Sequence, residues 1–295
     1  MCDDLTAIEE EAALERQGID RRGFAGLGAG LGAMGLAALA APLGASTVAA
    51  PRLTEKMVRI PTTAGVIDAF FVHPAKGRHP AVIMWPDVAG LREAYKVMAR
   101  RLAADGHAVL VLNQYYRSAP APHFEAITQW RTPEGQAKLR PMIPLLTPDA
   151  IGLDSRAAAE WLDRQRAVNT RRGIGVCGYC QGGPFAVRGT FAYPARIRAA
   201  ASFHGGGLVT DRPDSPHRLL KATSARFLFA IAQNDDKRSP GDKDALRAAA
   251  AEAGREAEIE VYPADHGWCT IDSPVFDKVQ ADKAWGRMLD LFGKL

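Results

Sequence analysis

The strongest constraint on the fold is a ten-residue run, residues 174–183, which reads IGVCGYCQGG. A short apolar stretch leads into a Gly-x-Cys-x-Gly pattern centred on Cys180, and small residues follow. This pattern is typical of a nucleophile elbow, a sharp turn from a buried strand into a helix, because only glycines allow strand and helix to pass so closely. A helix N-terminus favours negative charge and lowers the pKa of a cysteine thiol. We therefore predict that Cys180 is a nucleophile.

The same run contains a C-x-x-C pair, Cys177 and Cys180, which is also typical of redox pairs and of half a metal site. A redox pair normally opens a helix, whereas Cys177 lies inside the apolar run. The remaining cysteines, Cys2 and Cys269, form no second pair. The elbow is therefore favoured over thiol–disulfide exchange and over inert core cysteines. Cys177 itself is expected to be a small buried apolar residue.

The first fifty residues differ from the rest of the chain. Arg21 and Arg22 precede an uncharged run rich in Ala, Gly and Leu, residues 23–50. Paired arginines before a mildly apolar stretch that ends in small residues are typical of a twin-arginine export signal, so we expect residues 1–50 to be a signal peptide, cleaved near residues 45–50. The protein would then use the twin-arginine export machinery and be periplasmic or exported. The run is too rich in glycine to predict a stable membrane span.

Residues 30–35, GLGAMG, match the G-x-G-x-x-G of dinucleotide sites. Such a site needs a strand before it and an acidic residue about twenty positions on, and neither is credible in this context. We therefore expect no nucleotide and no other cofactor. The net charge of +4 without a long basic run argues against nucleic acid as a partner.

Residues 51–295 alternate between apolar runs and amphipathic stretches, as expected for one α/β domain. Strands are expected at 57–60, 66–72, 81–85, 108–112, 174–179, 199–203, 227–232 and 258–262. Helical spacing is found at 91–105, 149–166, 241–254 and 273–292. This alternation predicts a mostly parallel central sheet with helices on both faces.

A long segment, residues 118–148, is rich in proline and shows weak periodicity. A loop of this length in a compact domain is usually functional or disordered. We interpret it as a loop-rich cap over the site, with one short helix at 133–139. Trp130 in this cap, like Trp85 and Trp268 elsewhere, is as suited to core packing as to lining a pocket.

Polar side chains follow several of the predicted strands, and in parallel sheets the loops beyond the carboxyl ends of the strands carry the working residues. Cys180, Asp235 and His266 all lie in such loops, in the order nucleophile, acid, base that is found in α/β-hydrolases. His266 would exchange a proton during acyl transfer, and Asp235 would orient its ring. Asp235 is favoured over Asp236, which is expected to cap the following segment.

Three short motifs resemble the dienelactone hydrolase family, and the resemblance covers about residues 55–293. They are GYCQGG at 178–183, QND at 233–235, and Tyr262-Pro263 ahead of His266-Gly267. The resemblance implies the α/β-hydrolase fold. It also implies cysteine-dependent hydrolysis of a carboxylic ester or lactone, through a thioester acyl-enzyme, as in a carboxymethylenebutenolidase. The partner would be a small-molecule ester or lactone.

The resemblance also implies supporting roles. In the family an acidic residue after an early strand interacts with the resting thiol, and Asp87 holds that position, where the founding enzymes have glutamate. The backbone N–H groups of Val88 and Gln181 would form the oxyanion hole. Arg117 matches a family arginine that binds a substrate carboxylate, whereas Thr270 stands where the family has a second arginine.

Simpler explanations remain open for some of these residues. Asp87 also suits a helix cap, and Arg117 suits a surface ion pair. His204 follows a strand but has no place in the triad, and we expect it to support the triad residues from outside or to pack its own loop. The other histidines show no metal-ligand spacing, so no metal is predicted.

Two further hypotheses for function use the same residues. A thioesterase or acyltransferase would need the same triad and would differ only in its products. A degenerate α/β-hydrolase that binds a ligand without turnover is the alternative from a different class of protein, and the intact set of Cys180, Asp235 and His266 argues against it.

Overall fold

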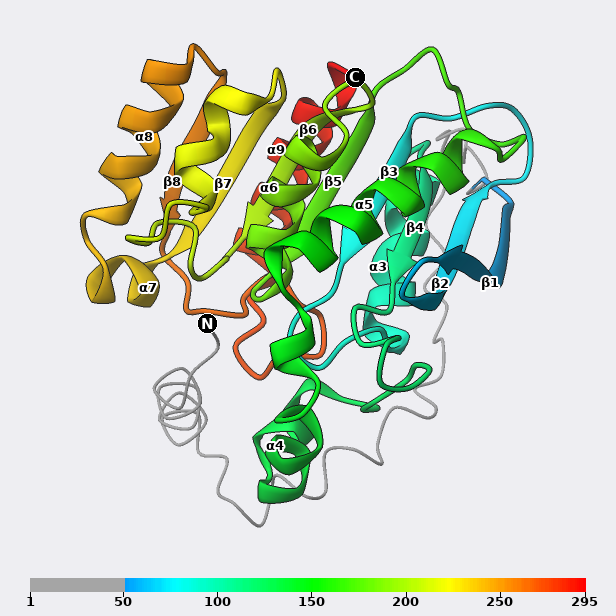
Figure 1. Ribbon diagram of the computed structural model, residues 1–295, viewed down its shortest axis with the longest axis horizontal. Helices are drawn as coiled ribbons and strands as arrows, with labels where there is room; N and C mark the ends of the chain where they lie inside the picture. Colours follow the sequence, from blue (N-terminus) through cyan, green and yellow to red (C-terminus); the bar gives the residue numbers. More distant parts are fainter. Residues whose placement is uncertain (1–50) are drawn as a thin grey trace, which may run out of the picture.

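The computed structural model describes residues 51–295 (Figure 1). The predicted export signal at residues 1–50, including the glycine-rich run at 30–35, lies outside these residues. Within residues 51–295, every helix is too short or too polar to cross a bilayer.

One eight-stranded sheet crosses the molecule in the order β1-β2-β4-β3-β5-β6-β7-β8. β1 and β2 form an antiparallel hairpin, β2 is also antiparallel to β4, and all the other neighbours are parallel. In chain order the strands span Leu53–Thr62, Gly65–Pro74, Ala81–Trp85, Ala108–Leu112, Ile174–Tyr179, Ile197–Phe203, Arg226–Ala232 and Ala257–Tyr262. Each expected strand forms, so the prediction of a mostly parallel sheet is confirmed.

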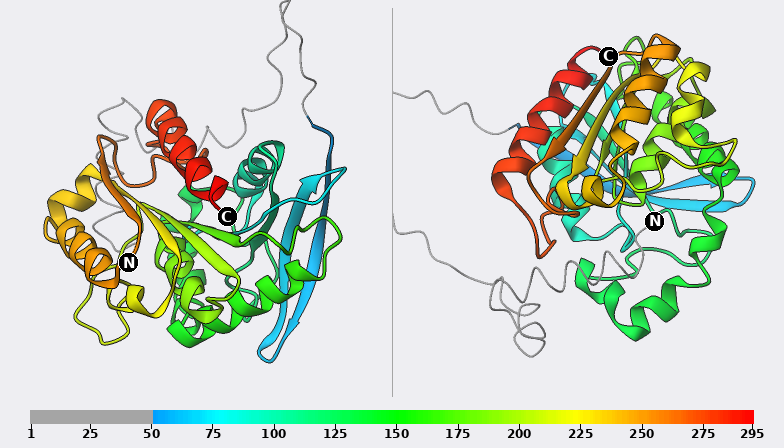
Figure 2. Two further views of the ribbon diagram at one scale, coloured as in Figure 1. Left: turned by 90° about the horizontal axis from the view of Figure 1, so that it is seen from above. Right: turned by 90° about the vertical axis from the view of Figure 1, so that its left-hand side faces the viewer.

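Helices cover both faces of this sheet (Figure 2). On one face lie α3 (Glu93–Ala104) and α9 (Lys278–Gly293), and on the other lie α5 (Pro148–Asp163), α6 (Gly182–Ala192) and α8 (Asp242–Ala253). Because both faces are buried, the central strands are apolar throughout rather than alternating, and all five residues of β3 are buried.

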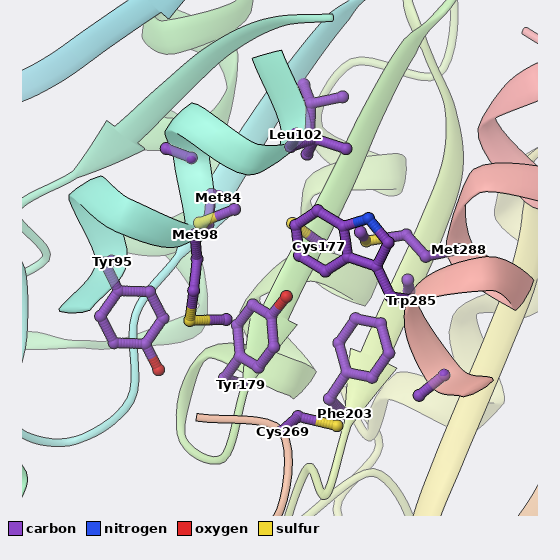
Figure 3. Close-up of a cluster of buried hydrophobic side chains, with 14 of the residues drawn as sticks. Met84, Tyr95, Met98, Leu102, Cys177, Tyr179, Phe203, Cys269, Trp285 and Met288 are labelled. Carbon is purple, nitrogen blue, oxygen red and sulfur yellow. The ribbon is translucent and has the colours of Figure 1, made fainter. Parts of the chain in front are cut away.

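Cys177 belongs to the core between the sheet and the α3/α9 layer (Figure 3). It is a free cysteine with 0% exposure, in one cluster with Tyr179 and Trp285. Burial raises the pKa of its thiol, which disfavours the thiolate that disulfide exchange requires. The prediction that Cys177 is a small buried apolar residue is confirmed.

The segment 118–148 contains the short helix expected at 133–139, which is α4 (Pro133–Leu139), together with two 3₁₀ turns, η2 (Ile127–Arg131) and η3 (Ile143–Leu145). Its apolar side chains, including Trp130, pack against Val88 and Ala89 in the loop after β3. Trp85, Trp130 and Trp268 are 1%, 7% and 0% exposed, so all three are packing residues.

The strand register brings the functional loops to one edge of the sheet. Trp85 pairs with Gly178, Tyr179 with Phe203, and Ala232 with Tyr262, so the loops that follow β3, β5, β6, β7 and β8 start side by side.

Two elements near this edge differ from expectation. Asp235 lies in a short helix, α7 (Gln233–Arg238), rather than in a loop. The last helix begins at Lys278 and not near Ser273, because the side chain of Asp277 caps it by accepting a hydrogen bond from Gln280 N. A 3₁₀ helix, η4 (Pro216–Ala222), lies in the long connection between β6 and β7.

Candidate active site

The turn after β5 is a sharp elbow with Cys180 at its apex. Cys180 has a φ of 52°, in the left-handed region that costs about 1–2 kcal/mol for a residue with a Cβ. A Cβ on Gly178 would lie 1.8 Å from the carbonyl oxygen of Gly182, and a Cβ on Gly182 would lie 2.4 Å from that of Trp85. Both positions therefore require glycine, and the strand end and helix start meet backbone to backbone.

The three predicted triad residues lie together. His266 Nδ1 is 2.7 Å from Asp235 Oδ2, and the backbone N–H of His266 donates to Asn234 Oδ1 at 2.8 Å. Asp236 forms an ion pair with Lys243 at 2.7 Å, so Asp235 is the carboxylate at the histidine. The Cys180 Sγ atom and a ring nitrogen of His266 lie within 4.8 Å of each other. Cys180 is disulfide-bonded in this structure, so thiolate chemistry at this site requires the reduced side chain.

The two backbone N–H groups expected to form an oxyanion hole are those of Val88 and Gln181. Within residues 51–295 neither group has a hydrogen-bond acceptor. The Tyr115 hydroxyl lies 2.8 Å from the carbonyl oxygen of Val88 and 2.9 Å from Gln181 Oε1, so it connects the two loops. Gln181 also stands at the N-terminus of α6, where the helix dipole favours negative charge.

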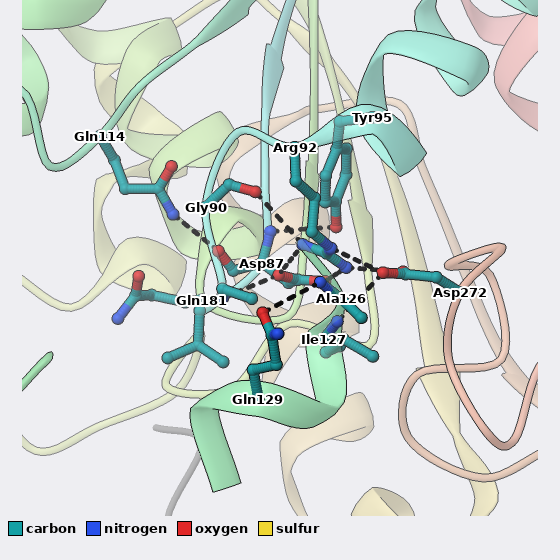
Figure 4. Close-up of polar contacts among 12 residues, drawn as sticks. Asp87, Gly90, Arg92, Tyr95, Gln114, Ala126, Ile127, Gln129, Gln181 and Asp272 are labelled. Atoms are coloured by element: carbon teal, nitrogen blue, oxygen red, sulfur yellow. Dashed lines mark hydrogen bonds and ion pairs between the residues drawn. The ribbon is translucent and has the colours of Figure 1, made fainter. Parts of the chain in front are cut away.

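Asp87 is held in a buried network of charges (Figure 4). Its two carboxylate oxygens accept hydrogen bonds from Arg92 at 2.7 and 2.9 Å, and Arg92 makes two further hydrogen bonds, both 2.7 Å, to the carboxylate of Asp272. Burial alone would lower the pKa of Arg92, but the charge of Asp87 and the hydrogen bonds and charge of Asp272 raise it well above its usual value. Arg92 is therefore a permanent cation between two carboxylates.

The same loop is fixed by its backbone. The Gln114 amide donates to the carbonyl oxygen of Asp87 at 2.7 Å, and Asp87 N donates to the Tyr95 hydroxyl at 3.0 Å. Asp87 Oδ1 also accepts from Ala89 N at 2.9 Å. The carboxylate predicted to face the resting thiol is thus engaged by Arg92 and by its own turn.

The sequence profile of the dienelactone hydrolase family matches residues 67–295. This chain belongs to the dienelactone hydrolase family. A candidate carboxymethylenebutenolidase of Salmonella typhi is 25% identical over 244 residues, covering 80% of this chain and 85% of the relative. One of Synechocystis is 26% identical over 241 residues, covering 80% of this chain and 95% of the relative.

Solved structures agree on the fold. A candidate dienelactone hydrolase from Klebsiella pneumoniae superposes with a TM-score of 0.69 at 22% identity, covering 83% of this chain and 100% of that chain. A metagenomic carboxylesterase gives 0.58 at 18% identity, covering 82% and 89%. The predictions of an α/β-hydrolase fold and of a dienelactone hydrolase-like ester hydrolase are confirmed.

The family resemblance implies that Arg117 binds a substrate carboxylate, but in the structure it pairs with a carboxylate of the protein. Its guanidinium donates two hydrogen bonds, 2.7 and 2.9 Å long, to the carboxylate of Asp154 on α5, and it stacks 4.5 Å above the ring of Tyr116. Arg117 is therefore an ion-pair residue, which was the simpler of its two explanations.

A cavity of about 530 Å³ opens next to the elbow, and Gln181 and Asp235 form part of its wall, whereas Cys180 and His266 do not line it. Arg117 does not line it, whereas Arg188 does. Arg188 is 3.7 Å from Asp214, and burial lowers its pKa. Apolar lining residues come from the cap, from α6 and from the β6–β7 connection; they include Ile143, Leu146, Phe185 and Leu208.

His204, which the sequence predicted only as a packing or supporting residue, is part of this edge. Its φ is 41° and its side chain is buried, with ring centroids 4.7 Å from His266 and 5.2 Å from Trp268. Burial, and then the charge of His266, lower the pKa of His204 well below its usual value, so the ring is neutral.

Sequence reasoning missed Arg92, Asp272 and Arg188. Arg92 and Asp272 are far apart in the chain, and no local pattern pairs them. Arg188 did carry a signal, because it is the one charged residue in the helix that follows the elbow.

The close contact at the elbow gives the first prediction. Gly178→Ala should lower the free energy of unfolding by about 3 kcal/mol or more, because its Cβ would overlap a carbonyl oxygen and neither backbone segment can move aside. Gly286→Ala in α9 is the matched control: a Cβ there meets no atom within 4 Å, and it should stabilise the protein by about 0.5–1 kcal/mol. Equilibrium urea unfolding measures both, and equal stabilities would contradict the account of the elbow.

Proposed function

We propose that this protein hydrolyses small carboxylic esters or lactones through a thioester on Cys180. The observation that carries the proposal is the position of Cys180 at the apex of the elbow, close to a histidine that is itself paired with Asp235. An isolated cysteine or histidine would be compatible with many functions. This order and this geometry match the nucleophile, base and orienting acid of acyl transfer.

The proposed reaction has two half-steps. The reduced Cys180 thiol gives its proton to His266, and the thiolate attacks the ester carbonyl to form a tetrahedral intermediate. The intermediate collapses to the thioester when His266 protonates the leaving alkoxide. His266 then takes a proton from water, the hydroxide adds to the thioester, and the acid leaves as the thiol is restored. Asp235 stabilises the imidazolium formed in each half-step.

The N–H groups of Val88 and Gln181 are proposed to bind the negative oxygen of each tetrahedral intermediate. Their lack of a protein acceptor within the described chain supports this role, because donors aimed at developing charge are left without a partner in the resting state. Asp87 is proposed to act mainly through this loop. Its ion pair with Arg92 fixes the turn that presents Val88 N–H.

The cavity of about 530 Å³ is proposed to bind the substrate, with its apolar cap and α6 side chains around the acyl or alcohol group. We assign recognition of a substrate carboxylate to Arg188 rather than Arg117, because Arg188 lines the cavity and Arg117 is held by two hydrogen bonds to Asp154. Its partner Asp214 is 3.7 Å away, outside good hydrogen-bond range, so the guanidinium keeps the capacity to bind an anion.

The nucleophile is tested with reduced full-length protein, p-nitrophenyl acetate and a panel of small lactones. Cys180→Ala should lower kcat/KM at least about 10³-fold, since the covalent route is lost. Cys177→Ala, three residues away, should stay within about threefold of the wild type. The Cys177 side chain is buried in the core beside α3 and α9 and takes no part in the proposed reaction. Wild-type activity in Cys180→Ala would refute the proposal, and an equal loss in Cys177→Ala would point to a redox pair instead.

The assignment of Arg188 is tested with a pair of esters that differ only in a carboxylate on the acyl chain. For the anionic ester, Arg188→Met should lower kcat/KM about tenfold or more, the value of one hydrogen bond to a charged group. The neutral ester should change little. Arg117→Met is the control, and it should change kcat/KM for the two esters by the same factor. A selective loss for the anionic ester in Arg117→Met, and not in Arg188→Met, would reverse the assignment.

A further inference from the structure

We propose that Cys180 in its reduced form, together with His204 and His266, makes a binding site for zinc or a similar metal ion. One sulfur and two imidazole nitrogens from these residues lie within 4.8 Å of one another, and all three residues are buried. Thiolate and imidazole are the ligands that zinc prefers in proteins, and three protein ligands leave a fourth position open. The three come from different strand ends, after β5, β6 and β8.

His204 supplies the independent reason to expect a ligand. It is 2% exposed, and within residues 51–295 neither ring nitrogen has a hydrogen-bond partner. Leaving a buried polar group unsatisfied costs about 1–3 kcal/mol, and its backbone in the left-handed region adds to this cost. A ligand bound to one of the ring nitrogens would offset this cost and would explain why a histidine stands at this position.

His266 is oriented as metal-binding histidines commonly are. Its Nδ1 is 2.7 Å from the Asp235 carboxylate, so Nε2 is the nitrogen that would bind the metal. A carboxylate on the far nitrogen fixes the ring and raises its basicity as a ligand. The pair that serves acyl transfer is therefore also suited to coordination.

The distances require only a small adjustment. Neighbouring ligand atoms of a tetrahedral zinc ion are about 3.3–3.6 Å apart, so the three ligand atoms, which lie within 4.8 Å of one another, would approach by at most about 1.5 Å. Trp268 packs against the ring of His204, and an apolar neighbour of this kind limits the access of water to a metal site. Binding releases the thiol proton of Cys180 as the sulfur–metal bond forms.

A bound metal would occupy the thiolate that attacks the ester, so metal binding and hydrolysis would exclude each other. The metal site nevertheless does not rest on the proposed function. It is measured without substrate, and it can hold or fail whether or not the protein hydrolyses esters.

The test uses Co²⁺, a coloured substitute for zinc, with reduced, metal-free, full-length protein. One equivalent should give a thiolate-to-cobalt charge-transfer band and the visible bands of a tetrahedral ion. Cys180→Ser should remove the charge-transfer band. His204→Asn, which tolerates the positive φ, should weaken Co²⁺ binding at least about 100-fold, because even outer partners of a metal site contribute 10–100-fold. Cys177→Ala and His79→Gln, at the opposite edge of the sheet, should match the wild type.

A second measurement does not depend on the folding of any variant. X-ray absorption of the zinc-loaded wild type should give one sulfur neighbour at about 2.3 Å and two imidazole nitrogens at about 2.0 Å. The proposal is overturned if the wild type shows no thiolate-to-cobalt band at one equivalent, if X-ray absorption finds no sulfur, or if a folded His204→Asn binds Co²⁺ as tightly as the wild type.

Discussion

The site depends on one close contact, between the end of β5 and the start of α6. A Cβ on Gly178 would overlap the carbonyl oxygen of Gly182, so the chain must turn with no side chain between the two segments. Cys180 is left at the apex with a positive φ, and its N–H is anchored to the carbonyl oxygen of Phe203 at 2.9 Å. The strain at the apex is maintained by the packed sheet around it, which holds the proposed nucleophile in a conformation that it would not adopt alone.

A second constraint joins the loops around this turn. Arg92 lies between Asp87 and Asp272, and Asp272 also accepts a hydrogen bond from the backbone N–H of Ile127 in the cap. The loop after β3, the segment after His266 and the cap are therefore connected through one guanidinium. Buried ion pairs add little to net stability, but breaking one leaves an unpaired buried charge at a cost of about 3–5 kcal/mol. The network therefore fixes the geometry of the site more than it stabilises the fold.

Much of the fold could be predicted because its signals are local. Buried strands such as Ala81–Trp85 appear as short apolar runs, and the helix Pro133–Leu139 is marked by Thr132 at its N-cap and Pro133 at its first position. The elbow is also a local pattern. Its position after a strand, like those of Asp235 and His266, was enough to place the three residues of the proposed triad at one edge of a parallel sheet.

The remaining features depend on contacts between distant parts of the chain. Asp235 rather than Asp236 contacts His266, and Asp236 instead forms an ion pair with Lys243. The contacts of Arg117 depend on Asp154 in a helix whose orientation the sequence does not give. His204 appeared as a packing residue, because histidine spacing alone cannot reveal that three strand ends bring it to Cys180 and His266. Side-chain pairing across a sheet edge is the information that a single sequence lacks.

The central claim is that Cys180 carries the acyl group, and rapid-quench mass spectrometry tests it most directly. Reduced wild-type protein is mixed with p-nitrophenyl acetate, quenched in acid during the first turnover, digested and analysed. The account predicts an acetyl group on the peptide that contains Cys180, removable by neutral hydroxylamine and absent in Cys180→Ala. Turnover without any acetyl group on this peptide, or an acetyl group on another residue that disappears at the rate of turnover, would contradict it.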